Sequence, residues 1–285
     1  MAMPTLNQPM TPQEFLGMRD FIYAQTGIFF NESKQYFLEN RLQRRLGDLN
    51  LKGYREYLDL LQGPRGREEL KQLFVEITTN ETSFWRNPPQ IEAFQKMVLP
   101  EAVKLAKERG ANRFRIWSAA CSSGEEPYTL AMICQEAKDT VLKGMTTEIV
   151  ATDISEKVLA QARDGAYGSY TLRNLTPVQM KAHFNQTGPD AFDVKPELKQ
   201  LVTLKHFNLV DWPGYKALGS FDVIFCRNVL IYFDEAVKTK VLKGFHEQLH
   251  PKSYLLVGHS ESIHSFNTGF ELLHFSKAMG YRKRG

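Results

Sequence analysis

Two glutamates stand at the start of a predicted helix, directly after a run of small residues. A buried strand over 114–119 leads into the small residues 121–124, and Glu125 and Glu126 follow. A dinucleotide site would carry several glycines in this turn, and the helix N-terminus would face a pyrophosphate. Here Gly124 is the one glycine, and both carboxylates would repel a diphosphate. We therefore expect a nucleoside ligand without phosphates, unless the glutamates only stabilise the first helical turn.

An aspartate ends the next predicted strand, which covers 148–152. In nucleotide-binding folds an acid at the tip of the second strand bonds the ribose hydroxyls, so Asp153 is the predicted ribose ligand. The alternative role is a helix N-cap, which Ser155 could share. S-adenosylmethionine fits the loop and the aspartate together, because it brings a ribose without phosphates and its ammonium and sulfonium charges are attracted to carboxylates. The combination favours a methyltransferase.

A cation, an amide and a phenol follow a third buried strand. The strand covers 221–226, and Arg227, Asn228 and Tyr232 come after it. Ligands of open α/β sheets bind at the carboxyl ends of the strands, which places these three side chains at the expected active edge. Each side chain also has a structural alternative. Arg227 would then form a surface ion pair, and Tyr232 would be a packed aromatic ring.

Short buried strands that alternate with helices must position these residues. This alternation of strands and helices begins near residue 113 and predicts an α/β fold with a parallel, doubly wound, Rossmann-like sheet. Mixed polar residues interrupt it at 170–200, where we expect an inserted subdomain. The expected strands cover 114–119, 148–152, 201–207, 221–226 and 254–259, and the expected helices cover 127–138, 155–163 and 234–249.

The first part of the chain predicts a small all-helical unit. Residues 11–14, Thr-Pro-Gln-Glu, form a capping-box pattern with proline at the first helical position, and Gly27 should end that helix. A polar segment with a double proline at 78–89 then marks the junction with the α/β part. The helices expected here cover 12–24, 54–61 and 68–77, with another that begins near 33.

Three arginines flank the leucine stripe of the helix that begins near residue 33. Arg41, Arg44 and Arg45 fall within little more than one turn, so this helix presents a basic strip to its surroundings. Such a strip suits docking to an acidic partner. Its alternative is a solvated face that only aids solubility.

Composition restricts the class of protein. A chain of 285 residues predicts about two compact units, and 42% hydrophobic residues suffice for a buried core. The longest apolar runs fall short of the roughly 18 residues that cross a bilayer. A net charge of +4 is too mild to indicate nucleic-acid binding. The N-terminus lacks the pattern of a signal peptide, and the three cysteines are scattered, so we expect a cytoplasmic protein with free thiols.

Five strings of this sequence resemble those of the CheR-type chemotaxis receptor methyltransferases, and the resemblance runs nearly end to end. It implies an enzyme that moves a methyl group from S-adenosylmethionine to glutamate side chains of chemoreceptor cytoplasmic domains. The products would be glutamate methyl esters and S-adenosylhomocysteine. The strings lie at 78–86, 117–128, 151–154, 225–233 and 258–261.

The resemblance also assigns roles to residues. It places Arg86 and Tyr232 beside the transferred methyl group, as the predicted catalytic residues. It places Arg41, Arg44 and Arg45 on a helix that docks the receptor's cytoplasmic helical bundle. The predicted cofactor contacts are Asn80, Thr82, Arg86, Glu125, Asp153, Asn208, Leu209, Arg227 and Asn228.

The same resemblance divides the chain into three segments. These are a helical receptor-docking domain at 1–78, a linker at 79–93 that contributes to the cofactor site, and a methyltransferase domain at 94–285 with an insert at about 170–200. The loop around 187–189 is shorter than in members that grip a peptide at the receptor's C-terminus, so we expect no tail binding. We also expect a monomer without metal, nucleic acid or membrane insertion.

Two other functions compete with this one. Residues 246–250, His-Glu-Gln-Leu-His, match the H-E-x-x-H string of zinc hydrolases, in which two histidines one helical turn apart bind the metal. Pro251 ends the helix at once, and no downstream helix plainly supplies a third ligand, although Glu271 is available. The other alternative is a sensor that binds S-adenosylmethionine without catalysis.

Overall fold

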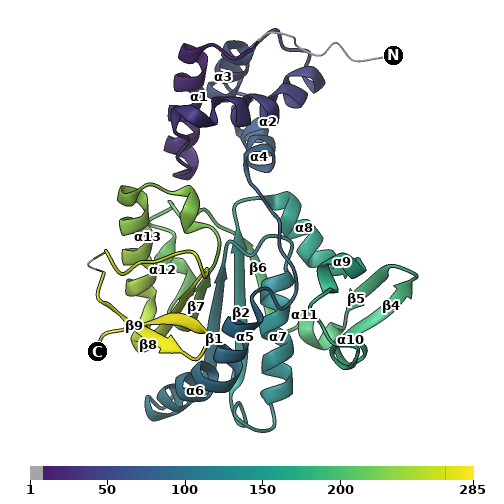
Figure 1. Ribbon diagram of the computed structural model, residues 1–285, viewed down its shortest axis with the longest axis vertical. Coiled ribbons are helices and arrows are strands. Elements are labelled where there is room, and N and C mark those ends of the chain that lie inside the picture. The colour runs from purple at the N-terminus through teal and green to yellow at the C-terminus, as the bar shows by residue number, and fades with distance from the viewer. Residues whose placement is uncertain (1–8, 267) are drawn as a thin grey trace. The chain divides into compact units, whose positions relative to one another are not determined.

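The computed structural model describes residues 9–266 and 268–285, which form two compact units (Figure 1). The N-terminal unit comprises Met1–Thr79 and a return segment, Tyr232–Val237. The larger unit comprises Asn80–Ile231 and Lys238–Gly285. Residues 1–8, the start of the first expected domain, lie outside the described residues. The domain boundaries expected from the sequence stay predictions.

The N-terminal unit is all-helical, and each of its α-helices buries side chains on one face. Leu38, Leu42 and Leu46 recur at steps of four on one helix and are fully buried. The expected capping box is present: Thr11 Oγ1 accepts a hydrogen bond from the Glu14 N–H, and the Glu14 carboxylate accepts one from the Thr11 N–H. The helices are α1 (Pro12–Thr26), η1 (Glu32–Lys34), α2 (Gln35–Asp48), α3 (Tyr54–Gln62) and α4 (Gly66–Ile77).

The return segment is tied to the N-terminal unit by backbone and side-chain bonds. Phe233 forms an isolated antiparallel bridge with Ile28, and the Phe29 N–H donates to the Tyr232 carbonyl at 2.9 Å. The Tyr23 hydroxyl donates to Asp234 at 2.8 Å. Tyr232 therefore belongs to the N-terminal unit, although the residues just before it belong to the larger one.

A seven-stranded sheet in the order β6-β2-β1-β7-β8-β10-β9 forms the centre of the larger unit. The first five strands in this order are parallel, as expected. The doubly wound α/β fold is thus confirmed, with one difference: β10 runs antiparallel to both of its neighbours. The strands are β1 (Arg113–Ala119), β2 (Thr146–Asp153), β6 (Val202–His206), β7 (Phe221–Cys226), β8 (Leu249–Val257), β9 (Phe270–Phe275) and β10 (Ala278–Lys283).

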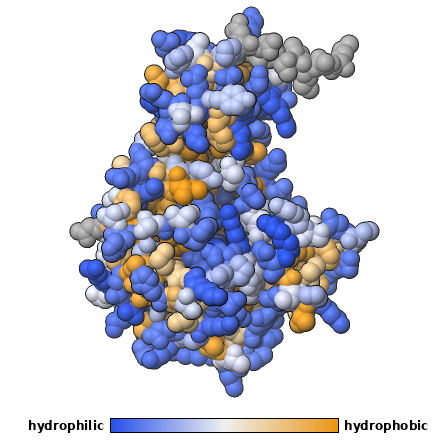
Figure 2. Space-filling model, in the orientation of Figure 1, coloured by the Kyte–Doolittle hydropathy of each residue, from blue (hydrophilic) through white to orange (hydrophobic). Residues whose placement is uncertain are grey.

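Helices cover this sheet and bury an apolar core against it. The side chains of Ile116, Trp117, Val223 and Phe225 are fully buried in the central strands β1 and β7. The visible surface of the molecule is largely hydrophilic (Figure 2). The helices of this part are α5 (Pro88–Ala93), η2 (Phe94–Val98), α6 (Leu99–Glu108), α7 (Glu125–Ala137), α8 (Glu156–Asp164), α9 (Ser169–Leu172), α10 (Pro177–His183), α11 (Pro196–Lys199), α12 (Tyr215–Leu218), η3 (Leu230–Tyr232) and α13 (Glu235–Gln248).

The insert contains a second, antiparallel sheet of three strands in the order β3-β5-β4. Its strands are β3 (Ala166–Tyr167), β4 (Phe184–Gly188) and β5 (Ala191–Val194). The β4–β5 hairpin projects beyond α9 and α10 in Figure 1. Its turn is short, because Gly188 pairs with Ala191 and only two residues lie between them.

Three parts of the larger unit differ from the sequence-based expectation. The double proline at Pro88 and Pro89 opens α5 instead of extending a linker, because proline is tolerated in the first turn of a helix. The strand expected at 254–259 is β8, which already begins at Leu249. The C-terminal hairpin of β9 and β10 was not expected.

Within the residues that the structure describes, no helix is long and apolar enough to span a membrane.

Candidate functional site at the carboxyl edge of the sheet

The loop after β1 adopts a backbone that favours glycine. Ala120, Ser122 and Gly124 all have positive φ, and Gly124 reaches +99°. A Cβ at Gly124 would lie 2.7 Å from the Tyr167 hydroxyl and 2.9 Å from the Ala162 Cβ, closer than real Cβ atoms come. The single glycine therefore lets the loop pack against α8 and β3, and no glycine-rich phosphate cradle is present in it.

Asp153 ends β2 and fastens the loop after β1. Its Oδ2 accepts from the Ser122 N–H and its Oδ1 from the Ser155 N–H, both at 2.9 Å. The N-cap alternative for Asp153 is wrong, because Ser155 occupies the N-cap position of α8 and its side chain makes no capping hydrogen bond. The carboxylate is 6% exposed, and burial raises its pKa. Each oxygen keeps a lone pair beyond these bonds, so the same group can still accept from ribose hydroxyls.

The two glutamates at the start of α7 have different surroundings. Glu125 is 2% exposed and accepts a hydrogen bond from the Ser123 hydroxyl at 2.8 Å, and burial raises its pKa. Glu126 is committed to protein contacts: it accepts from Ser118 Oγ at 2.7 Å and from Arg227 at 3.2 Å. Unlike Glu126, Glu125 forms no ion pair with a cation of the described residues, and its role as a cofactor contact stays a prediction.

Arg227 is buried at the end of β7, so the expected alternative of a surface ion pair is wrong. Its Nη1 donates to Glu126, its Nη2 donates to the Arg86 carbonyl at 2.6 Å, and its Nε is buried without a hydrogen-bond partner. Burial lowers the pKa of its guanidinium, although Glu126 opposes the effect. Through these two bonds Arg227 joins the segment that carries Arg86 to α7.

The linker segment lies against the same loop and helix. The Asn80 carbonyl accepts from Ser122 Oγ at 3.1 Å, and the Trp85 N–H donates to Thr129 of α7 at 3.1 Å. Thr82 is half-buried in this segment. Arg86 is also half-buried; its Nη1 donates to the Glu81 carbonyl at 3.1 Å. No ion pair joins Arg86 to a carboxylate of the described residues, so it is a cation that a substrate anion could contact.

The residues after β6 and β7 complete the edge. The Phe207 N–H donates to the Asp153 carbonyl at 3.0 Å and so holds the next two residues near the end of β2. Of these, Asn208 accepts the Val210 N–H through its side chain, and Leu209 is buried. After β7, Asn228 adopts a left-handed conformation with φ of +61°. The structure thus brings the predicted cofactor contacts of the larger unit to the carboxyl ends of β1, β2, β6 and β7; their roles as contacts stay predictions.

The sequence interpretation gave no role to Glu261, although the string that contains it contributed to the resemblance. Its buried carboxylate accepts backbone N–H bonds from Gly258 and Asn228 at 2.7 Å and from Ile231 at 3.2 Å. A polar residue three positions after a glycine that ends a buried strand was the available signal. The pairing with Asn228 could not be read from it, because the two residues are 33 positions apart.

The three arginines of α2 have unequal surroundings within the N-terminal unit. Arg45 forms two hydrogen bonds with the buried Glu69, at 2.7 and 2.5 Å. Arg41 donates to the Glu76 and Thr78 carbonyls at the end of α4. The Arg44 side chain is 82% exposed and has only a distant ion pair, 4.0 Å, with Asp48. The docking role of the strip stays a prediction, and Arg44 is the member most accessible to a partner.

The zinc string does not form a metal site. α13 ends at Gln248 and His250 already lies in β8, so the two histidines do not share a helical face. The ring of His246 packs against Phe270, and Glu271 pairs with Arg282 at 2.5 Å. Across residues 9–266 and 268–285 no group of three His, Cys, Asp or Glu side chains could hold a metal ion.

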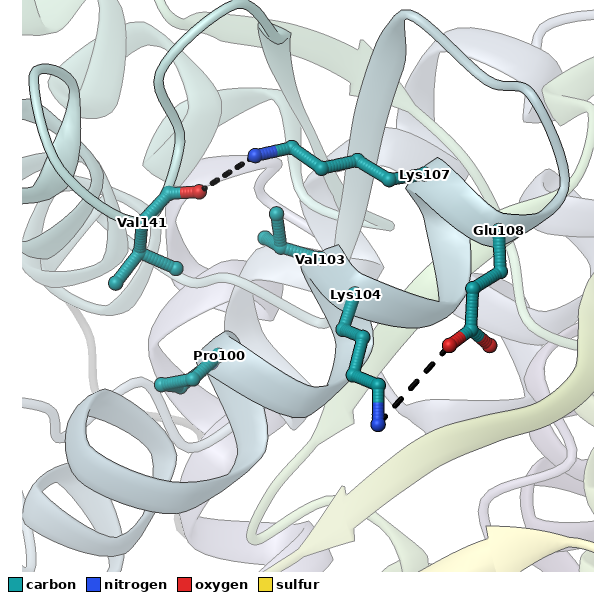
Figure 3. Close-up of a pocket in the computed structure, with 6 residues that line it drawn as sticks. All are labelled: Pro100, Val103, Lys104, Lys107, Glu108 and Val141. Atoms are coloured by element: carbon teal, nitrogen blue, oxygen red, sulfur yellow. Dashed lines mark hydrogen bonds and ion pairs between the residues drawn. The ribbon is translucent and has the colours of Figure 1, made fainter.

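Two cavities of the larger unit lie in different places. One, of about 510 Å³, lies between α6 and the turn after α7. It lies at the amino ends of β1 and β2, away from the polar edge. Figure 3 shows Lys107 reaching the Val141 carbonyl and Lys104 beside Glu108. The other, about 320 Å³, lies at the carboxyl end of β8 and is lined in part by Gly258 and Glu261. Only the second lies on the side of the sheet where the predicted contacts gather.

The chemistry of this edge fits a cationic nucleoside. Asp153 and Glu125 supply buried carboxylates, and the loop between β1 and α7 lacks the glycines that would cradle a pyrophosphate. The sequence profile of the CheR methyltransferase SAM-binding domain matches residues 80–279, and that of the CheR methyltransferase all-alpha domain matches residues 13–78. The chain belongs to the CheR methyltransferase family.

Curated relatives agree with this assignment. Chemotaxis protein methyltransferase 2 of Vibrio cholerae is 35% identical, with 96% of this chain and 94% of the relative covered. Chemotaxis protein methyltransferase 1 of Pseudomonas aeruginosa is 37% identical, with 95% and 98% covered. A probable chemotaxis protein methyltransferase of Rhizobium etli is 39% identical, with 85% and 90% covered.

Membership in the CheR family confirms several expectations. The chain is a chemotaxis methyltransferase that uses S-adenosylmethionine as its cofactor. The resemblance drawn from the five sequence strings is confirmed, as is the combination of an all-helical domain with a Rossmann-like sheet. The two alternatives, a zinc hydrolase and a sensor without catalysis, find no support.

Proposed function

We propose that this enzyme methylates glutamate side chains in the cytoplasmic helical bundle of a chemoreceptor and produces glutamate methyl esters. The observation that carries the proposal is the distribution of charge at the polar edge. Asp153 and Glu125 suit the cationic cofactor, whereas Arg86 carries a positive charge with no carboxylate paired to it among the described residues. An anionic acceptor is the substrate that such a cation would orient.

The chemistry needs positioning more than proton transfer. A glutamate carboxyl has a pKa of about 4.3 and is ionised at neutral pH, so its oxygen is a ready nucleophile. S-adenosylmethionine, when bound, supplies an electrophilic methyl group on a sulfonium. Alignment of the two reactants for in-line attack can lower the barrier by several kcal/mol. Arg86 would hold the attacking carboxylate in that alignment.

Charge sets a limit on how tightly the acceptor is held. Attack consumes the charges of both the carboxylate and the sulfonium, so a strong clamp on the anion stabilises the ground state more than the transition state. Arg227 meets this limit because Glu126 neutralises it within the protein. Arg86 is half-buried and its Nη1 is held by the Glu81 carbonyl, which leaves a solvated cation suited to orienting an anion.

The remaining cofactor contacts follow from the chemistry of each group. Asp153 would accept from the ribose hydroxyls, and Glu125 would attract the ammonium group. Asn80 and Thr82 of the linker, Asn208 and Leu209 after β6, and Arg227 and Asn228 after β7 complete the proposed cofactor site. Tyr232 would stand beside the methyl group.

The all-helical unit would recognise the receptor. Arg44 is exposed on α2, and a basic side chain suits the acidic surface of a helical bundle. The β4–β5 turn of the insert is short, which supports an enzyme that acts without binding a receptor tail. We propose that the enzyme acts as a cytoplasmic monomer.

Transfer of a labelled methyl group tests the proposed function. The purified chain is incubated with labelled S-adenosylmethionine and receptor-containing membranes, and we expect label on the receptor that alkali releases as methanol. Receptor with its acceptor glutamates replaced by glutamine is the control and should stay unlabelled. Label that resists alkali would indicate an amine or ether product. The absence of label, with cofactor binding intact, would instead favour a sensor that binds S-adenosylmethionine without catalysis.

A further inference from the structure

A buried carboxylate outside the predicted contacts holds the loop after β7. Glu261 is 6% exposed, and its two oxygens accept three backbone N–H bonds. Two come from the neighbouring strand ends, Asn228 after β7 and Gly258 after β8, both at 2.7 Å. The third comes from Ile231 at 3.2 Å. One side chain thus joins the ends of two parallel strands to η3.

The backbone of this loop needs such a partner. Asn228 has φ of +61°, a left-handed conformation that glycine favours and that asparagine tolerates better than most other residues. The ladder between β7 and β8 ends at the pair Cys226 and Val257, so the Asn228 N–H finds no strand partner beyond it. The carboxylate of Glu261 replaces that lost pairing, and hydrogen bonds to a charged acceptor are among the stronger ones.

Position 258 has no room for a side chain larger than the hydrogen of glycine. A Cβ there would lie 2.6 Å from Glu261 Oε2 and 3.0 Å from the Asn228 nitrogen. Any larger residue would push the carboxylate away from both N–H donors. The glycine, the glutamate and the left-handed asparagine therefore form one mutually dependent unit.

We propose that Glu261 is a positioning residue for methyl transfer, which holds Asn228 where it contacts the cofactor. The inference rests on the proposed role of Asn228 in the cofactor site. Glu261 does not act as a base, because three N–H donors already occupy its oxygens and the acceptor carboxylate is ionised without help. Its effect reaches the cofactor through the backbone of the loop.

Two substitutions of graded severity test the role. Glu261→Gln keeps one carbonyl oxygen, which can still accept from Asn228 and Gly258, but its amide group would face the Ile231 N–H. Glu261→Ala removes all three bonds. Calorimetry with S-adenosylhomocysteine should show an affinity loss of about tenfold or more for the alanine variant and a smaller loss for glutamine. If the Glu261→Ala variant does not fold, the affinity of the Glu261→Gln variant decides the outcome.

Asp222 provides the matched control at the opposite end of β7. It is 2% exposed and, like Glu261, accepts a backbone N–H, from Arg115 at 2.8 Å, together with a bond from Arg109. Asp222→Asn should lower the melting temperature and leave the affinity for S-adenosylhomocysteine nearly unchanged. Equal affinity losses in the Asp222 and Glu261 variants would reduce Glu261 to a general structural role and overturn the inference.

The readout keeps this test separate from the proposed function. Binding of S-adenosylhomocysteine needs no receptor, so a failure to methylate chemoreceptors would not affect it. A folded Glu261→Gln variant with unchanged affinity and unchanged turnover would overturn the positioning role while the proposed function stands.

Discussion

Glu126 of α7 and Arg227 after β7 form an ion pair at 3.2 Å, with side chains 12% and 3% exposed. The two residues are 101 positions apart, and the pair joins the helix after β1 to the end of β7. Ser118 Oγ and the Arg86 carbonyl satisfy further hydrogen-bonding groups of the pair. A buried pair of this kind depends on both partners, because either charge alone would be uncompensated.

We expect Glu126→Gln to destabilise the protein by about 3 kcal/mol, because it leaves the Arg227 cation buried beside a weaker acceptor. Denaturation in urea measures the change. The double variant Glu126→Gln with Arg227→Met removes the cation as well and should recover part of the loss. A single variant with the wild-type midpoint would show that the pair contributes little to stability.

Glu125 should make stability depend on pH. Burial raises the pKa of its carboxyl above the value in the unfolded chain, and the Ser123 hydroxyl only partly opposes this. A raised folded-state pKa contributes stability that is present below the unfolded pKa, about 4.3, and is lost as pH rises through the folded pKa. Above the folded-state pKa the ionised, buried carboxylate therefore lowers stability.

Glu125→Gln should accordingly be more stable than the wild type at pH 7, and the gap should close below about pH 4. The same substitution should weaken binding of S-adenosylmethionine, since it removes a charge that attracts the cofactor's ammonium. Urea denaturation at several pH values and calorimetry measure the two effects. The exposed Glu156 of α8 provides the control as Glu156→Gln, and a gap independent of pH would contradict the assignment.

The sequence predicted the positions of the polar edge better than its pairings. Asp153 and Arg227 follow strands whose apolar runs are visible in the sequence, so their place at the carboxyl edge could be inferred. The residue that pairs with each charged group could not be inferred from the sequence. Glu125 and Glu126 are neighbours in the sequence, yet only the fold shows that one meets Arg227 and the other does not.

The same limit applies to α5 and β10 of the larger unit. The helical run that starts at α5 was missed because Pro88 and Pro89 suggested a break, although both are tolerated in a first turn. β10 runs antiparallel because a short turn joins it to β9, and the alternation of strands and helices elsewhere in this unit gives no signal for such a hairpin. Such features depend on tertiary pairing more than on local pattern.

Receptor docking can be separated from stability within α2. Arg44→Ala should raise the KM for the receptor substrate several-fold and leave the melting temperature unchanged, because the side chain is 82% exposed. Arg45→Ala leaves the buried Glu69 without its partner and should cost roughly 1–2 kcal/mol of stability. The Tyr57 hydroxyl, which donates to Glu69 at 2.8 Å, limits that loss. An unchanged KM in the Arg44 variant, measured as initial rates of label transfer, would exclude it from docking.

Arg86 and Tyr232 are the two residues predicted beside the methyl group, and their substitutions should differ in kind. Tyr232→Phe removes only the hydroxyl, so turnover should fall more than cofactor affinity does. Arg86→Ala removes a cation and should lower turnover and cofactor affinity together. Initial rates and calorimetry on the same preparations separate the two effects. A Tyr232 variant that loses affinity but keeps its turnover would assign the phenol to binding, and an Arg86 variant unchanged in both would remove that residue from the site.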